Sequence, residues 1–138
     1  MIENLEKYFL PEQTYYLNGI TYKIIETSAV ERELNCIDNI NVEVNDADGV
    51  KLILTRTLKF APEGIFELSI SFGALLKFDE KVKDEINWHE IKLAEEFGIN
   101  GDFVLRNLLD RISLLIAEIT ASFGQSPIIV PPVIAREN

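Results

Sequence analysis

Cysteine and histidine are almost absent from this sequence. Cys36 is the only cysteine, which excludes an intrachain disulfide, and no histidine or basic residue adjoins it to lower its pKa toward that of a nucleophile. His89 is the only histidine, so a zinc site, which needs several ligands at a recognisable spacing, is not expected. We interpret His89 as an exposed polar residue in the first turn of a helix rather than as a general base.

Basic residues are also scarce. The chain has 13 Lys and Arg against 23 Asp and Glu, a formal net charge of −10. Phosphate backbones and anionic membrane surfaces both bind clustered Lys and Arg, so neither nucleic acid nor a membrane is an expected partner. A run of roughly 18 uncharged apolar residues for a membrane span is missing, and the acidic N-terminus lacks the apolar segment of a signal peptide. We expect a soluble cytoplasmic protein without membrane insertion.

Recognisable catalytic motifs are missing as well. Residues 98–101 (Gly-Ile-Asn-Gly) lack the lysine and the preceding strand of a phosphate-binding loop, and no serine has the setting of a nucleophile elbow. The oxygen-rich residues 45–49 indicate a turn, because Ala47 interrupts the alternation of ligands that a calcium loop needs. We therefore expect no enzyme, no metal and no cofactor, since acid–base chemistry would have to be built from carboxylates alone.

Alternating apolar residues predict an antiparallel sheet. Hydrophobic residues make up 47% of the chain, and β-branched and aromatic residues predict strands over residues 20–33, 40–44, 50–60 and 66–72. The clearest strand has its apolar residues on one face: Val50, Leu52, Leu54, Leu58 and Phe60. Short turns join the later strands as hairpins, which predicts an antiparallel β-meander.

Two helices are expected after the strands. Asn87 and Glu90 form a capping box for a short helix that ends at Gly98, and Asp102 caps a long helix that ends at Gly124. The long helix carries an apolar stripe: Leu105, Leu108, Leu109, Ile112, Leu115, Ile116, Ile119 and Phe123. Because this stripe must cover the sheet, we predict a single α+β domain over residues 1–138. It consists of a four-stranded antiparallel β-meander with the long helix and the short crossover helix packed on one face.

Several aromatic residues lie outside the strand alternation: Tyr8, Phe9, Tyr15, Tyr16, Trp88, Phe97 and Phe103. They either complete the core or line an exposed apolar groove of the kind that binds other proteins. The sequence leaves both interpretations open. In the absence of a catalytic set, binding of other polypeptides is the function that we expect.

The second half of the chain resembles the SecB family of bacterial export chaperones. One part of the resemblance is the strand pair KLILTRTLKF and GIFELSISFGALLKF, and the other is the helix LLDRISLLIAEITASFG followed by SPIIVPPVI. The resemblance covers residues 50–134, with weaker agreement back to Ile40. Arg111, Phe123, Pro131 and Pro132 fall where the family has an arginine-bearing helix, an aromatic helix end and a proline-containing pair.

The resemblance implies a SecB-like domain assembled as a homodimer or a dimer of dimers, which the open edges of the predicted sheet also favour. It further implies ATP-independent binding of unfolded or precursor polypeptides, held for a translocase motor in hydrophobic grooves beside the sheet and the crossover. That crossover would be residues 77–102 here. The residues expected to bind polypeptide are Trp88, Ile91, Phe97 and Phe103.

Two departures from the family pattern favour an alternative function. Family members continue into a second helix and an acidic tail that contacts the translocase motor, whereas this sequence ends at Asn138. The crossover also contains a charged helix where the family has a looser, glycine-containing segment. The alternative is a specific interaction or regulatory protein on the same fold without general chaperone activity. Some relatives belong to toxin-neutralising sets, and the sequence leaves open whether this chain does.

Overall fold

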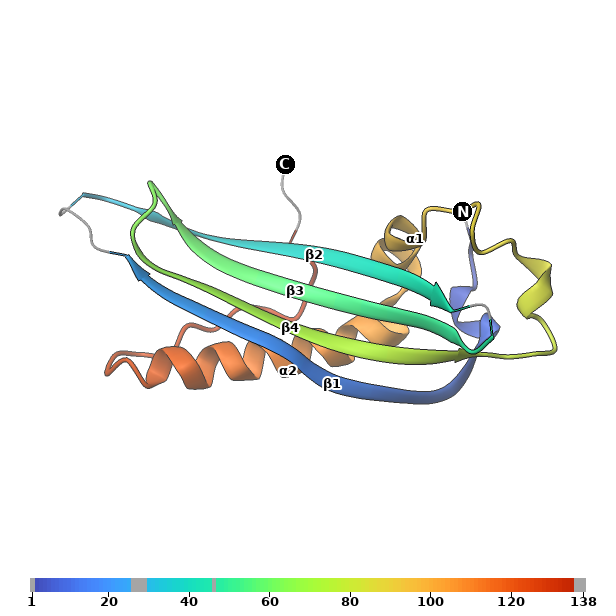
Figure 1. Cartoon of the computed structure of the whole chain (residues 1–138). Helices are drawn as coiled ribbons and strands as arrows, with labels where there is room; N and C mark the ends of the chain where they lie inside the picture. Colours follow the sequence, from blue (N-terminus) through green and yellow to red (C-terminus); the bar gives the residue numbers. More distant parts are fainter. Residues whose placement is uncertain (1, 26–29, 46, 136–138) are drawn as a thin grey trace.

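A four-stranded antiparallel sheet forms one layer of the protein (Figure 1). The computed structural model describes residues 2–25, 30–45 and 47–135. The strands are β1 (Phe9–Ile25), β2 (Glu33–Asn45), β3 (Gly49–Ala61) and β4 (Ile65–Phe78). They lie in the order β1-β4-β3-β2, and each neighbouring pair is antiparallel.

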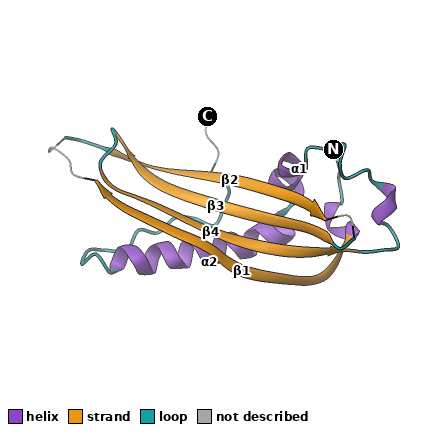
Figure 2. Cartoon of the chain, in the orientation of Figure 1, coloured by secondary structure: helices purple, strands orange, loops and turns teal. Residues whose placement is uncertain are grey.

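The long helix forms the second layer, and Figure 2 shows it lying along one face of the sheet, with the shorter helices gathered at one end. The helices are two 3-10 helices, η1 (Leu5–Tyr8) and η2 (Lys83–Glu85), and two α-helices, α1 (Leu93–Asn100) and α2 (Asp102–Ala121). Helix α2 packs mainly on β4, and α1 packs against β2 and α2. The predicted α+β class, with a four-stranded antiparallel sheet and two helices packed on it, is confirmed.

The core lies between the sheet and α2. Leu54, Leu58 and Leu68 on the strands, with Ile112 and Ile116 on the helix, are fully buried there. The buried strand residues recur at every second position, and the buried helix residues recur at helical spacing, as the sequence predicts. The opposite face of the sheet is largely polar. The sequence therefore folds with one covered face of the sheet and one open face.

The position of the first strand corrects the prediction. Only β2, β3 and β4 form a meander, because β1 pairs with β4 rather than with β2. The strand predicted over residues 20–33 is not one element: β1 ends at Ile25, residues 26–29 lie outside the described residues, and β2 begins at Glu33. Register shifts between Phe9 and Gln13 and between Leu17 and Gly19 explain why the first half of β1 shows no regular alternation.

The short crossover helix also begins later than predicted. Asn87 caps a turn instead of a helix: its side-chain oxygen accepts from the N–H of His89 at 3.4 Å, and its carbonyl accepts from the N–H of Glu90 at 3.1 Å. Helix α1 starts at Leu93 and continues through Gly98 to Asn100. The next residue, Gly101, lies so close to α1 that a Cβ there would be 2.3 Å from the carbonyl oxygen of Phe97.

Candidate polypeptide-binding surface

Trp88 lies in an aromatic cluster at the crossover end of the sheet. Its ring centroid is 5.5 Å from that of Tyr8, 5.6 Å from that of Phe9 and 5.0 Å from that of Phe78. The side chain is 7% exposed, and its indole N–H donates to the carbonyl oxygen of Lys83 at 2.9 Å. Trp88 therefore closes the end of the core, and the burial of this large side chain explains why the chain turns at Asn87 instead of starting a helix.

The other three predicted binding residues surround the same cluster. Phe97 is fully buried, 5.8 Å from Phe9 and 6.1 Å from Phe103 between ring centroids. Phe103 and Ile91 are partly buried and pack against the core. The structure thus brings the four residues to one region, where Trp88 and Phe97 complete the core. Their predicted role in polypeptide binding stays a prediction. Phe103 also lines an open hollow beside the start of β1, and Trp88 lines another one, with Asn87 and His89.

A second hollow lies between β2 and α1 and was not predicted. It has a volume of about 380 Å³ and is lined by Asp38, Asn39, Ile40, Ala94, Glu95, Gly98 and Ile99. Strand β2 is an edge of the sheet, so one row of its backbone N–H and C=O groups points away from β3. The N–H of Asp38 points that way, and the alternation of an antiparallel ladder directs the backbone of Ile40 to the same side. The hollow therefore combines backbone hydrogen-bonding groups with an apolar wall.

A buried ion pair joins β3 to β2 beside this hollow. The Nε of Arg56 is 2.8 Å from Oδ1 of Asp38, and a second guanidinium nitrogen donates to Oδ2 at 2.8 Å. Both side chains are fully buried. Burial disfavours the charged form of Arg56, but the hydrogen bonds and the charge of Asp38 outweigh it and raise the pKa of Arg56 above its ordinary value. Arg56 is consequently charged at every pH at which the protein is folded.

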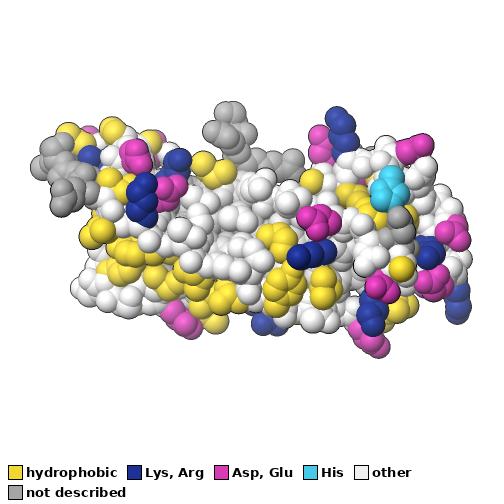
Figure 3. Space-filling model, viewed as in Figure 1, with side chains coloured by type: hydrophobic (Ala, Val, Ile, Leu, Met, Phe, Trp, Pro, Cys, Tyr) yellow, Lys and Arg dark blue, Asp and Glu magenta, His cyan; other side chains and the backbone are white. Residues whose placement is uncertain are grey.

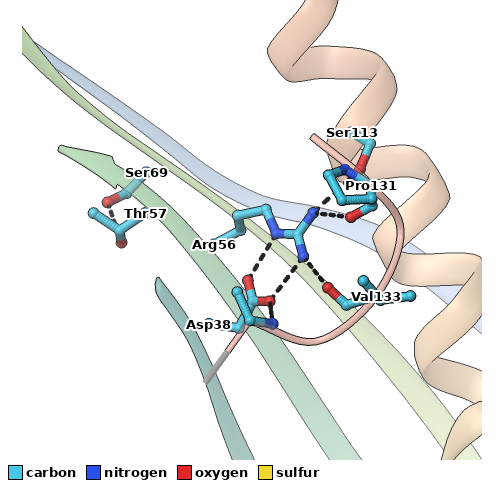
Figure 4. A network of polar contacts seen from close by, with 8 residues as sticks. Asp38, Arg56, Thr57, Ser69, Ser113, Pro131 and Val133 are labelled. Atoms are coloured by element: carbon cyan, nitrogen blue, oxygen red, sulfur yellow. Dashed lines mark hydrogen bonds and ion pairs between the residues drawn. The ribbon is translucent and has the colours of Figure 1, made fainter. Parts of the chain in front are cut away.

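The ion pair holds the segment after α2, residues 127–135, which we call the C-terminal strap (Figure 4). Arg56 donates to the carbonyl oxygens of Pro131 at 2.8 Å and Val133 at 2.6 Å. Asp38 accepts from the N–H of Ala135 at 2.6 Å, and its own N–H donates to the carbonyl of Ala135 at 3.2 Å. The strap is therefore fixed to the sheet through its backbone.

Sequence reasoning missed Arg56 and Asp38. Arg56 lies between Leu54 and Leu58 on the face of β3 whose other side chains are apolar. Its position alone therefore indicates a side chain that points into the core. Such a residue requires an acidic partner. The partner could not be identified from the sequence, because the register that places Asp38 opposite Arg56 is set by the fold.

The residues on which the resemblance rested also make defined contacts. The guanidinium of Arg111 lies 5.0 Å from the ring centroid of Tyr15, and Phe123 packs on Tyr22 at 5.2 Å. Pro131 accepts one of the hydrogen bonds from Arg56. These residues join α2 and the strap to the sheet.

The described residues form neither a metal site nor a membrane-spanning helix. Their His, Cys, Asp and Glu side chains do not gather into a group able to hold a metal ion. None of the helices described has both the length and the apolarity that crossing a membrane requires.

Comparison with known proteins identifies the fold. No family model matches the chain, and no curated protein matches its sequence. Among solved structures, the chain is similar to the SecB-like chaperone Rv1957 of Mycobacterium tuberculosis in complex with a ChAD peptide from the antitoxin Rv1956 HigA1. The TM-score is 0.63 at 13% sequence identity, and the match covers 86% of each chain. The chain has a SecB-like fold.

Proposed function

We propose that this protein is an ATP-independent chaperone of the cytoplasm that binds extended apolar segments of non-native polypeptides, without catalytic activity. The observation that carries the proposal is the hollow between the edge of β2 and α1, where backbone groups and an apolar wall lie side by side. An extended chain added to a sheet edge gains affinity from backbone hydrogen bonds, and every sequence supplies these groups. Such a site accepts many clients.

The chemistry of the hollow fits an apolar client. Ile40 on β2 and Ala94 on α1 form its wall with Ile99, whose side chain is 49% exposed. Burial of apolar client side chains against this wall adds about 25 cal/mol for each Å² removed from water. The net charge of −10 helps to keep a complex with a non-native client in solution.

The fold supports the proposal, because the structural neighbour Rv1957 is a SecB-like chaperone. The same comparison supports a second candidate. That neighbour was solved with a peptide from one antitoxin, which favours a specific interaction protein that serves a single partner. A pull-down from cell extract separates the two: a general chaperone yields many clients, and a dedicated one yields a single protein. Delivery of clients to a translocase motor would be a further step of the first candidate.

We also propose that the chain forms a homodimer through β1. This strand has 17 residues and is the other edge of the sheet. Its helix-facing side leaves Leu17, Ile20, Tyr22 and Ile24 exposed, and Figure 3 shows apolar side chains gathered along this side of the molecule. A long apolar edge is a template for pairing with a second strand, and a two-fold axis would pair β1 with its own copy.

The first test is light scattering during dilution of a chemically unfolded client, with and without a several-fold excess of this protein. We expect the protein to suppress scattering and to elute in a complex with the client. Ile99→Asp should reduce the suppression, because it places a charge in the apolar wall. Leu114→Asp is the matched control, since Leu114 is also an exposed apolar residue on a helix but does not line the hollow. Unchanged scattering in the presence of the unmodified protein would refute general chaperone activity.

A further inference from the structure

The hydrogen bonds that hold the C-terminal strap use its backbone rather than its side chains. Its described hydrogen bonds with the sheet and with α2 use backbone atoms: the carbonyls of Pro131, Val133 and Ala135 and the N–H groups of Ile128 and Ala135. The partners are the side chains of Arg56, Asp38 and Thr120 together with the N–H of Asp38. We call this set of partners the strap seat.

The strap buries some of its side chains and exposes others. Ile128, Val130 and Ile134 are partly buried against the core, whereas Ile129 is 74% exposed and Val133 is 62% exposed. Residues 128–130 show the alternation of an extended chain docked on a surface, whereas Pro131, Pro132 and Val133 are all exposed. Pro131 and Pro132 add no backbone N–H groups, so a segment with prolines here leaves fewer donors to satisfy. The seat therefore selects an extended, apolar, proline-containing segment.

The strap seat and the β2–α1 hollow meet at Asp38. Asp38 lines the hollow, and its outward N–H is already bonded to Ala135. A polypeptide that pairs with β2 beyond the hollow would need the same N–H. The end of the strap thus sets how far a client can extend along the edge of β2.

We infer that the strap seat is a second polypeptide-binding site, which takes an extended, proline-containing apolar segment of another protein when the strap leaves. The strap is then an intramolecular competitor that regulates access to the edge of β2. This inference rests on the proposed function, because it names a ligand class and a form of regulation for the same surface. It follows from the seat itself, whose present occupant shows what the seat binds: backbone carbonyls and N–H groups of a segment whose apolar side chains are partly buried against the core.

The test uses a fluorescent peptide with the sequence of residues 126–135, SPIIVPPVIA, and measures its binding to the full chain by anisotropy. A tethered competitor acts at an effective concentration on the order of millimolar, so the unmodified protein should bind the peptide weakly. The double variant Ile128→Ala/Ile134→Ala loosens the strap at its buried side chains and should bind at least about tenfold more tightly. Its matched control, Ile129→Ala/Val133→Ala, changes the exposed side chains of the same strap and should bind like the unmodified protein.

Equal affinity of the two double variants, or binding to neither, overturns the inference. If circular dichroism shows that the first variant is unfolded, the milder single variant Ile134→Ala replaces it with the same expectation and the same refutation. Copies of the unmodified protein that separate when peptide is added would show that the seat takes the strap of a second copy, which also overturns the assignment to another protein. The client scattering assay run on the same samples separates the two proposals. Suppressed scattering without peptide binding refutes the strap inference alone, and failure of both refutes the proposed function.

Discussion

Removal of the charge on Asp38 is the most informative perturbation of this fold. Asp38→Asn keeps the size of the side chain and one acceptor oxygen, but it leaves Arg56 charged and buried without a counter-charge. Arg56 cannot relieve this by losing its proton, because a guanidinium group stays protonated in proteins. The new amide N–H₂ would also face the N–H donors of Arg56 or of Ala135, which now converge on Asp38.

The expected cost is large compared with the stability of a domain. Breaking a buried ion pair by removing one partner costs about 3–5 kcal/mol, and the free energy of unfolding of a domain is about 5–15 kcal/mol. Asp38→Asn should therefore remove about a fifth or more of the stability. The loss should release the strap first, because Oδ2 of Asp38 accepts from the N–H of Ala135 and also from the Arg56 guanidinium that holds Pro131 and Val133.

Urea unfolding followed by far-UV circular dichroism measures this effect. The matched control is Glu43→Gln, which removes a carboxylate from the same strand on its outer, exposed face. Surface substitutions of this kind change stability by about 0.5 kcal/mol or less. If Asp38→Asn changed the free energy of unfolding by no more than Glu43→Gln does, the ion pair between Arg56 and Asp38 would not stabilise the fold as we propose.

Three further predictions test the core, the edge strand and the cysteine. Phe97→Ala should lower the free energy of unfolding by about 3–5 kcal/mol in the same urea assay, because it empties a fully buried site; a change near zero would mean that Phe97 is not in the core. Ile24→Lys should convert a dimer to a monomer in light scattering, because it places a charge on the apolar edge of β1, and an unmodified protein that is already monomeric would contradict the proposed interface. Burial raises the pKa of Cys36, an effect that Arg56 opposes and Asp38 reinforces. The thiol should therefore react with Ellman's reagent at pH 8 more slowly than a free cysteine does. The reaction rate should increase as the pH rises through the elevated pKa of the thiol. A rate equal to that of free cysteine would contradict the burial.

The elements with strong periodicity were predictable from the sequence. Strands β3 and β4 alternate with a period of two, and α2 has an apolar stripe, so each element carries its own signal. Strand β1 does not, because its register shifts move side chains from one face to the other. Its place beside β4 depends on pairing between residues far apart in sequence, such as Tyr22 and Leu68, and no local pattern records that.

The roles of the aromatic residues could not be predicted from the residue types alone. A buried core side chain and the wall of a binding groove require the same residue types, so the sequence left both roles open for Trp88 and Phe97. Their burial resolves how they pack. At Asn87, the capping signal was real, but the packing of Trp88 into the cluster directs the chain into a turn, and the helix forms only from Leu93. Tertiary packing here overrides a local preference.

The ion pair between Arg56 and Asp38 is best understood through what it binds. A buried ion pair is often no more stabilising than well-packed apolar residues of similar volume, so stability alone gives no reason for an arginine between Leu54 and Leu58. An apolar pair in that position would hold an apolar segment, but it could not fix the segment along its length, because hydrophobic contacts have no direction. The hydrogen bonds to Pro131, Val133 and Ala135 have both direction and spacing. We therefore interpret the pair as a device that sets the register of an extended backbone on the sheet, which is the same task that the free edge of β2 would perform for a client.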